Sequence, residues 1–260
     1  MIKALFFDID GTLVSMKIHT ILPSAVECIA QAKHKGIKVF IATGRPLGII
    51  NNIDGILPFI DGYLTANGAH CIVGNEVVYH QPILKADVEL ILNEATKQDY
   101  SCVVVGQDAI GTFNYKDNID RIFRRMLDIH GVDYNIPIEE LLKTDILELT
   151  PFVSVHQEQQ LMPRIPNCVS ARWHPEFMDV TSRLADKGRG LTAIAHHLGI
   201  ALSDCVAFGD GGNDISMFVA AGIGVAMGNA GDNVKQAANF VTKHIDEEGI
   251  MHAMKYLGIV

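Results

Sequence analysis

The sequence predicts an α/β protein with a parallel sheet covered by helices on both faces, and a second α/β domain inserted into it. Strand-like and helix-like segments alternate at the start of the 260-residue chain and again after about residue 182. The strands of these blocks are nearly continuous apolar runs, as expected of strands buried on both faces. Between the blocks, short strands and helices follow one another without that rhythm.

The first block alternates in the manner of a doubly wound sheet and ends in a hairpin around Gly74 and Asn75. Apolar residues at helical spacing and Gly36 as a stop signal define its first helix. The elements expected in order are a strand over 3–9, a helix over 24–36, a strand over 37–43, a short helix over 45–53, a strand over 61–68 and the hairpin over 70–80.

The middle and last blocks complete the chain. Gln81 and Pro82 indicate an exit from the first domain, which predicts a core of residues 1–81 and 182–260 and an insert of residues 82–181. In the insert we expect helices over 88–98 and 118–131 and strands over 101–107, 110–115, 145–155, 168–173 and 176–182. In the last block we expect helices over 187–200, 213–222, 232–239 and 246–258 and strands over 204–210, 223–228 and 240–242.

The composition narrows the class of protein. The net charge of −9 argues against general binding to nucleic acid or to anionic membranes. Five scattered cysteines, an odd number without a CxxC pair, indicate reduced thiols. We find no signal-peptide pattern and no apolar run long enough to span a bilayer. We therefore expect a soluble, cytoplasmic protein, and nothing in the sequence demands more than a monomer.

Two carboxylates close the first strand, in the stretch FFDIDGTLV. Asp8 and Asp10 follow an apolar run, although buried charge is costly unless it is paired or bound to a metal. A solvated turn would explain a DxD pair alone. Ligands of doubly wound sheets, however, bind at the carboxyl ends of the strands, where these acids lie.

Two further segments offer groups for an anion. Thr43 ends the second strand with a hydroxyl donor, and Gly44 lets a ligand approach the backbone. An ordinary capped turn also explains this pair. Lys187 opens a helix, where the helix dipole disfavours a cation, so a bound anion would account for it. A solvated lysine is the plainer alternative.

A second acidic cluster lies in FGDGGNDISM. Asp210 ends a strand, two glycines follow, and Asn213 and Asp214 begin a helix. Helix capping explains them in part, but three oxygen-bearing side chains beside a Gly-Gly turn suit a hard cation. Together the four segments supply a nucleophile, a magnesium site and donors for phosphoryl oxygens, which is the set needed for phosphoryl transfer.

The segments DIDGTLV, IATGR, DKG and GDGGND resemble the four motifs of the haloacid dehalogenase (HAD) superfamily, in order. The insert resembles the C2B-type α/β cap of Cof-type, class IIB sugar phosphatases. NNIDG, DGYLTANGA, FMDVTS and GVAMGNA are similar to bacterial hexose phosphate phosphatases of that group. The resemblance implies a HAD-like Rossmannoid three-layer core with an inserted cap.

The resemblance also implies roles for the motif residues. Asp8 would be the nucleophile that forms an aspartyl phosphate, and Asp10 would be the general acid and then the general base. Thr43 and Lys187 would hold the phosphoryl group, with Gly44 beside them. Mg²⁺ would be ligated by Asp8, the Asp10 backbone carbonyl and Asp210, with support from Asn213 and Asp214.

The leaving group would be selected elsewhere. Arg172 could reach a hydroxyl or a second phosphate, and Trp173 could stack on a sugar face. A solvated arginine and a core tryptophan are the plain alternatives. Asn67 and Gly68, after a core strand, could also face the substrate, although a simple turn explains them nearly as well.

The function expected is a Mg²⁺-dependent phosphatase of small phosphomonoesters, above all hexose or other sugar phosphates. Alternatives are a phosphomannomutase-like phosphomutase, or a phosphatase for another phosphorylated metabolite such as a cofactor or nucleotide. A non-enzymatic phospho-switch would be better served without Asp10. Dehalogenase chemistry would need neither Asp10 nor the acidic cluster, and an ion pump would need membrane segments.

Overall fold

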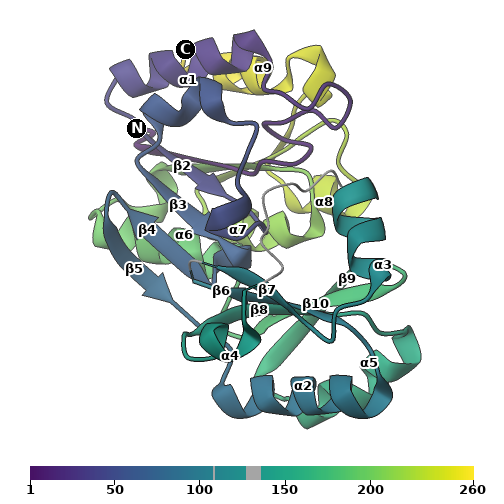
Figure 1. Cartoon of the computed structure of the whole chain (residues 1–260). Helices are drawn as coiled ribbons and strands as arrows, with labels where there is room; N and C mark the ends of the chain where they lie inside the picture. Colours follow the sequence, from purple (N-terminus) through teal and green to yellow (C-terminus); the bar gives the residue numbers. More distant parts are fainter. Residues whose placement is uncertain (108, 127–135) are drawn as a thin grey trace. The chain divides into compact units, whose positions relative to one another are not determined.

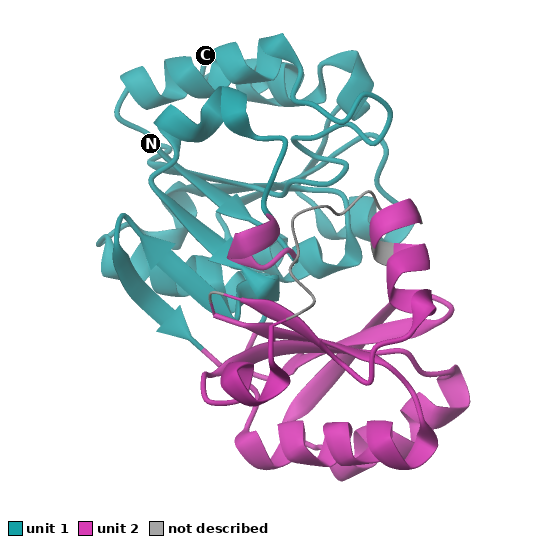
Figure 2. Ribbon diagram, in the orientation of Figure 1, with its two compact units in different colours: residues 1–44, 50–80, 186–260 teal, residues 45–49, 81–185 magenta. Residues whose placement is uncertain are grey.

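The computed structural model describes residues 1–107, 109–126 and 136–260. The chain forms two compact units (Figure 2): unit 1 comprises residues 1–44, 50–80 and 186–260, and unit 2 comprises residues 45–49 and 81–185. The domain bounds expected from the sequence place 45–49, 81 and 182–185 in the core instead. In the structure Ile49 packs against an apolar cluster of unit 2 that contains Val103 and Phe177, which explains the grouping of 45–49.

Unit 1 is built on an eight-stranded sheet of order β13-β12-β11-β1-β2-β3-β4-β5. Its first six strands in this order pair in parallel, and β4 and β5 add an antiparallel hairpin. The strands are β1 (Ala4–Phe7), β2 (Lys38–Ala42), β3 (Gly62–Thr65), β4 (His70–Val73), β5 (Glu76–His80), β11 (Cys205–Gly209), β12 (Ile223–Ala226) and β13 (Phe240–Val241).

Helices cover both faces of this sheet (Figure 1). The α-helices are α1 (Pro23–His34), α6 (Lys187–His197), α7 (Ile215–Ala220), α8 (Asp232–Ala237) and α9 (Gly249–Tyr256), and the 3₁₀ turns are 47–49 in unit 2 and 54–59, 66–68, 202–204, 212–214 and 245–247 in unit 1. Leu5 and Phe7 of β1 face the core under α1 and α9, while Ala4 and Phe6 face the core under α6 to α8. The alternation within one buried strand thus joins two cores into a three-layer α/β fold.

Unit 2 has a five-stranded antiparallel sheet of order β7-β6-β8-β10-β9. Its strands are β6 (Cys102–Gly106), β7 (Ile110–Phe113), β8 (Ile146–Pro151), β9 (Cys168–His174) and β10 (Phe177–Ser182). Its helices are α2 (Lys85–Gln98), α3 (Asp117–Ile119) continued by a π-helix over Asp120–Met126, α4 (Ile138–Leu141) and α5 (Val155–Leu161), with a 3₁₀ turn at 162–164. Consecutive residues of β6, such as Val103 and Val104, enter separate clusters on the two faces of the sheet.

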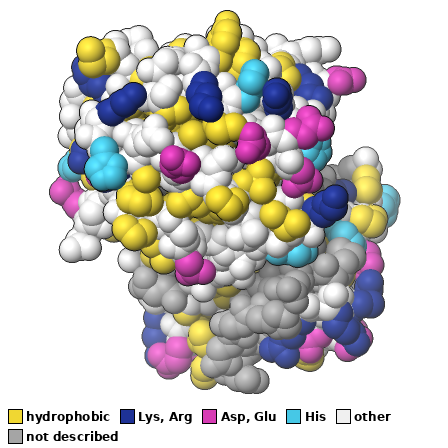
Figure 3. Space-filling model, turned by 90° about the horizontal axis from the view of Figure 1, so that it is seen from above, with side chains coloured by type: hydrophobic (Ala, Val, Ile, Leu, Met, Phe, Trp, Pro, Cys, Tyr) yellow, Lys and Arg dark blue, Asp and Glu magenta, His cyan; other side chains and the backbone are white. Residues whose placement is uncertain are grey.

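The predicted α/β class with an inserted α/β domain is confirmed, and the differences lie in short helices. Only 47–49 of the expected helix over 45–53 is helical. The strand expected over 145–155 ends at Pro151, and helix α5, which the sequence did not predict, begins at Val155. The helix expected over 118–131 is described as far as Met126. Within the described residues, no helix has the length and apolar character that crossing a bilayer requires. Acidic and basic side chains are interspersed over the face shown in Figure 3.

Candidate active site

Four parallel strands of unit 1 carry polar residues where they end. β1, β2, β3 and β11 are neighbours, so their carboxyl ends meet at one edge of the sheet. Asp8 follows β1 and is 7% exposed, and its backbone N–H donates to Phe208 O at 3.0 Å. Asp10 is partly buried, and a bridge to Val14 closes the turn that follows it.

Lys187 reaches this edge from the start of α6. Asp186 caps the helix by accepting a bond from the backbone N–H of Arg189 at 2.8 Å, which fixes the first turn. The Lys187 side chain is buried, and its Nζ donates to Asp8 Oδ1 at 2.7 Å and to Asp214 Oδ1 at 2.5 Å. One ammonium therefore bridges two carboxylates that are 206 positions apart, counted from residue 8 to residue 214.

The loop after β11 holds the other two carboxylates. Asp214 is fully buried, and its Oδ2 accepts the backbone N–H groups of Asp210 and Gly211, each at 2.9 Å. Asp210 accepts the hydroxyl of Thr12 on Oδ1 at 2.8 Å and the Asn229 amide on Oδ2 at 3.3 Å. Both carboxylates are thus held in fixed orientations by donors.

Two glycines make room for these carboxylates. Gly11 has φ +84°, and a Cβ there would lie 2.3 Å from Oδ2 of Asp210. A Cβ on Gly209 would lie 2.4 Å from the carboxyl carbon of Asp214. No side chain fits at such distances, so the close approach of the acids requires glycine at both positions.

The ends of β2 and β3 add a group of polar residues. Thr43 is buried, and its carbonyl accepts the backbone N–H of Asn67 at 3.2 Å. Asn67 Oδ1 accepts the Asn213 amide at 2.9 Å and would lie 3.1 Å from a Cβ on Gly44. Gly68 has φ +91° and contacts the backbone at the start of α6. The structure therefore brings these residues into one neighbourhood of unit 1.

The acids outnumber the cation in the cluster, and the pKa values reflect this. Burial raises the pKa of Asp8 well above its usual value; the Lys187 ammonium opposes the rise, and Asp214 and Asp210 add to it. Burial likewise raises the pKa of Asp210 to about 6, against the hydrogen bond from Thr12. Burial disfavours the Lys187 ammonium, but Asp214 and Asp8 outweigh burial and raise its pKa.

The donor set suits a hard divalent cation. One carboxylate oxygen from each of Asp8, Asp210 and Asp214 lies within 4.8 Å of the others. Carboxylate oxygens are the ligands that Mg²⁺ and Ca²⁺ prefer. Three acids against one ammonium leave excess negative charge, which a cation would relieve, so the residues fit such an ion.

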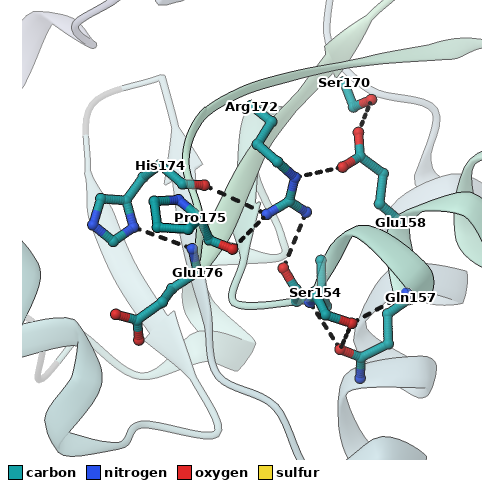
Figure 4. Close-up of polar contacts among 9 residues, drawn as sticks. Ser154, Gln157, Glu158, Ser170, Arg172, His174, Pro175 and Glu176 are labelled. Atoms are coloured by element: carbon teal, nitrogen blue, oxygen red, sulfur yellow. Dashed lines mark hydrogen bonds and ion pairs between the residues drawn. The ribbon is translucent and has the colours of Figure 1, made fainter.

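Arg172 lies in unit 2, and the protein itself engages its guanidinium (Figure 4). Nε donates to Glu158 Oε2 at 2.6 Å, Nη1 to the carbonyls of His174 and Pro175 at 3.4 and 3.1 Å, and Nη2 to Val153 O at 3.0 Å. Four acceptors already face its five N–H donors. A substrate contact by Arg172 stays a prediction. The side chain of Trp173 lies outside the described residues.

The structure adds Thr12 and Asn229 to the neighbourhood, and we assigned neither from the sequence. Thr12 is buried within the first motif, DIDGTLV, and Asn229 follows β12 in GVAMGNA. For Thr12 the signal was its place after Asp10 and Gly11. For Asn229 it was a strand end, the same position that pointed to Asp210.

The model of the haloacid dehalogenase-like hydrolase family matches residues 5–254. The protein YkrA of Bacillus subtilis (strain 168) is 30% identical over 99% of this chain and 98% of its own length. The HAD subclass IIB sugar phosphatase BT4131 is 43% identical, with a TM-score of 0.90 over 99% of this chain and 100% of that structure. BT1666 of Bacteroides thetaiotaomicron, a phosphatase of the same superfamily, is 33% identical, with a TM-score of 0.90 over 100% and 96% of the two chains.

Proposed function

This chain belongs to the haloacid dehalogenase-like hydrolase family and is a phosphatase of it, and from this premise we propose that it is a Mg²⁺-dependent hydrolase of small sugar phosphates. The observation that carries the proposal is the ammonium of Lys187, bound to both Asp8 and Asp214 beside Asp210. The proposed nucleophile Asp8, the carboxylates that would bind Mg²⁺ and the ammonium of Lys187 that would bind phosphate therefore lie in one buried site.

In the first step, a carboxylate oxygen of Asp8 attacks phosphorus, and the bond from phosphorus to the ester oxygen breaks. Asp10 gives its proton to the departing alkoxide, so the products are an alcohol and an aspartyl phosphate. In the second step, Asp10 takes a proton from water as the water oxygen attacks phosphorus, which releases inorganic phosphate and restores Asp8. Asp10 is partly buried two residues after Asp8, at the start of the turn that its bridge to Val14 closes, and this position supports the acid and base roles.

The remaining motif residues hold the phosphoryl group. Lys187 and the Thr43 hydroxyl would donate to its oxygens, and Gly44 leaves the backbone open beside them. Asp214 supports Lys187, because it binds the ammonium while two backbone N–H groups fix its other oxygen. When bound, Mg²⁺ would neutralise phosphoryl charge and keep Asp8 ionised.

The ligands proposed for Mg²⁺ are Asp8, Asp210 and the Asp10 backbone carbonyl, with Asn213 and Asp214 in support. The mutual distance of the Asp8, Asp210 and Asp214 oxygens supports this set. Asn213 is exposed and donates to Asn67, which supports a place for both at the rim of the site. Among hard cations, Mg²⁺ is the usual choice where phosphate is also bound.

We propose residues 1–81 and 182–260 as the catalytic core and 82–181 as a cap that selects the leaving group. The solved sugar phosphatase at 43% identity supports a sugar leaving group. Asn67 and Gly68 from the core and Arg172 and Trp173 from the cap are the proposed contacts. Five free, buried cysteines support a reducing, cytoplasmic location, and we propose a monomer.

Two variants test the mechanism. Asp8→Asn removes the nucleophile, and we expect no hydrolysis of any phosphomonoester. Asp10→Asn keeps the backbone carbonyl, so Mg²⁺ binding measured by calorimetry should persist while turnover falls about 10²–10⁴-fold. Unchanged turnover in Asp10→Asn would contradict the acid and base roles.

A phosphate-release screen tests the substrate. Sugar phosphates should have the highest kcat/KM, above nucleotides and phosphorylated cofactors. Steady phosphate release without a bisphosphate activator is expected of a hydrolase. Isomerised hexose phosphate in place of released phosphate would instead indicate a phosphomutase.

A further inference from the structure

The side chain of Asn229 joins three segments of unit 1 that are far apart in the sequence. Its Nδ2 donates to the backbone carbonyl of Gly11 at 2.8 Å and to Asp210 Oδ2 at 3.3 Å. Its Oδ1 accepts the backbone N–H of Ile245 at 3.0 Å. The loop after Asp8, the proposed cation ligand Asp210 and the segment after β13 therefore share one amide.

The chemistry of the partners fixes which way the amide faces. The Ile245 N–H needs an acceptor, while the Gly11 carbonyl and the Asp210 carboxylate need donors. Only the orientation with Oδ1 toward Ile245 satisfies all three. Thr12 donates to the other oxygen of Asp210, so both oxygens of this carboxylate have a fixed donor.

The backbone around Asn229 is held as firmly as its side chain. Met227 N–H donates to Gly209 O, and Gly228 N–H donates to Lys243 O, each at 2.9 Å. A Cβ on Gly228 would lie 2.5 Å from the backbone nitrogen of His244, so only glycine allows this approach. Backbone hydrogen bonds to Gly209 and to Lys243 therefore fix the loop independently of the side-chain contacts of Asn229.

We propose that Asn229 is a positioning residue, which holds Asp210 and the Gly11 turn in the arrangement that a divalent cation requires. The inference rests on the proposed function, because Asp210 is a cation ligand only there. A neutral amide suits this task, since it orients a carboxylate without adding positive charge that would compete with the ion. Donors to a ligating carboxylate commonly set metal affinity in this way.

The test compares Asn229→Ala with Asn239→Ala. Asn239 Oδ1 accepts the backbone N–H of Gly224 at 2.7 Å, so its loss also removes a side-chain to backbone bond in unit 1. We expect Asn229→Ala to raise the Kd of Mg²⁺ about 10–100-fold by isothermal titration, and Asn239→Ala to leave it within twofold. A folded Asn229→Ala protein with wild-type Mg²⁺ affinity would overturn the inference, and so would a wild-type protein that binds no Mg²⁺.

A second variant separates the donor from the structural tie. Asn229→Asp keeps the size and the acceptor for Ile245 N–H, but it replaces the N–H donor to Gly11 O and to Asp210 Oδ2 with a carboxylate oxygen. We expect kcat at saturating Mg²⁺ to fall at least tenfold while KM stays within twofold. Wild-type kcat together with wild-type Mg²⁺ affinity would refute the positioning role.

The outcomes also separate this inference from the proposed substrate. If Mg²⁺ affinity depends on Asn229 but no sugar phosphate is hydrolysed, the substrate proposal fails and the inference stands. If sugar phosphates are hydrolysed and Mg²⁺ affinity does not depend on Asn229, the inference fails and the substrate proposal stands.

Discussion

At the scale of single residues, the candidate site depends on two glycines of unit 1 as much as on its charged side chains. Gly11 and Gly209 let the carboxylates of Asp210 and Asp214 come within a distance that any Cβ would occupy. The glycine at residue 36 provides a comparison, because its φ of +80° is similar to that of Gly11 but nothing lies within 4 Å of its Cβ position.

We predict that Gly11→Ala and Gly36→Ala lose similar amounts of unfolding free energy, but that only Gly11→Ala loses much of its activity. Each places alanine at positive φ, which costs roughly 1–2 kcal/mol of unfolding free energy. Gly11→Ala also displaces Asp210, so kcat should fall about 100-fold, as for a misplaced catalytic group. Urea unfolding and phosphate-release kinetics measure the two effects. Equal turnover in the two variants would mean that the Asp210 contact does not matter.

A site residue can be predicted from the sequence only when its role is evident from the residues next to it in the chain. Asp8, Thr43 and Asp210 follow apolar strands, and the carboxyl ends of neighbouring parallel strands meet at one edge of a sheet, so the sequence alone predicts that these residues lie together. Thr12 follows Asp10 and Gly11, and Asn229 follows a strand, so their positions alone make both residues candidates. Their role comes from hydrogen bonds to Asp210, 198 and 19 residues away, and no local pattern predicts those bonds.

At the scale of elements, Asp61 ties a helix to the sheet. Its carboxylate accepts the Lys33 ammonium from α1, the backbone N–H of Val39 on β2 at 2.9 Å and the Lys38 ammonium at 2.9 Å. Burial raises its pKa, but these three donors outweigh burial, and the pKa lies below its usual value. The position just before β3 thus joins α1, β2 and β3.

We predict that this tie is lost in acid. A carboxyl whose pKa is lowered by folding stabilises the folded state above its unfolded pKa, near 4, and loses that effect as the pH falls through the folded pKa. Asp61→Asn should therefore lower Tm at pH 7 by roughly 2–4 °C, and the difference should shrink below pH 4. The exposed Asp54 gives the control, Asp54→Asn, whose Tm should follow the wild type. A pH-independent difference would mean that the charge plays no part.

Long elements were predictable and short ones were not. Apolar runs and 3.6-residue spacing predicted α1, α2 and α6 because each buries a stripe against a sheet. Helix α5 was missed, although Ser154 and Gln157 form a capping box at its start. A seven-residue helix shows too few turns for its period to stand out from a strand pattern.

At the scale of the whole molecule, each unit has its own apolar core. The clusters under α1 and α9 and under α6 to α8 belong to unit 1, and those around β6 and β10 belong to unit 2. Asp8, Lys187, Asp210 and Asp214 all belong to unit 1. The sequence predicts an inserted domain from a change of pattern along the chain, because a core of continuous apolar strands differs from a block of short mixed elements.

We predict that Mg²⁺ stabilises unit 1 selectively. An ion that binds only the folded state adds about 2.7 kcal/mol at 100 times its Kd, and this gain reaches the elements that carry its ligands. Hydrogen exchange with and without Mg²⁺ should show slower exchange in β1, β11 and the start of α6, and unchanged exchange in β6 and β8 of unit 2. Chelation should reverse the effect, and Asp210→Asn should abolish it. Equal protection of both units would contradict selective stabilisation, and would mean that the two units unfold together.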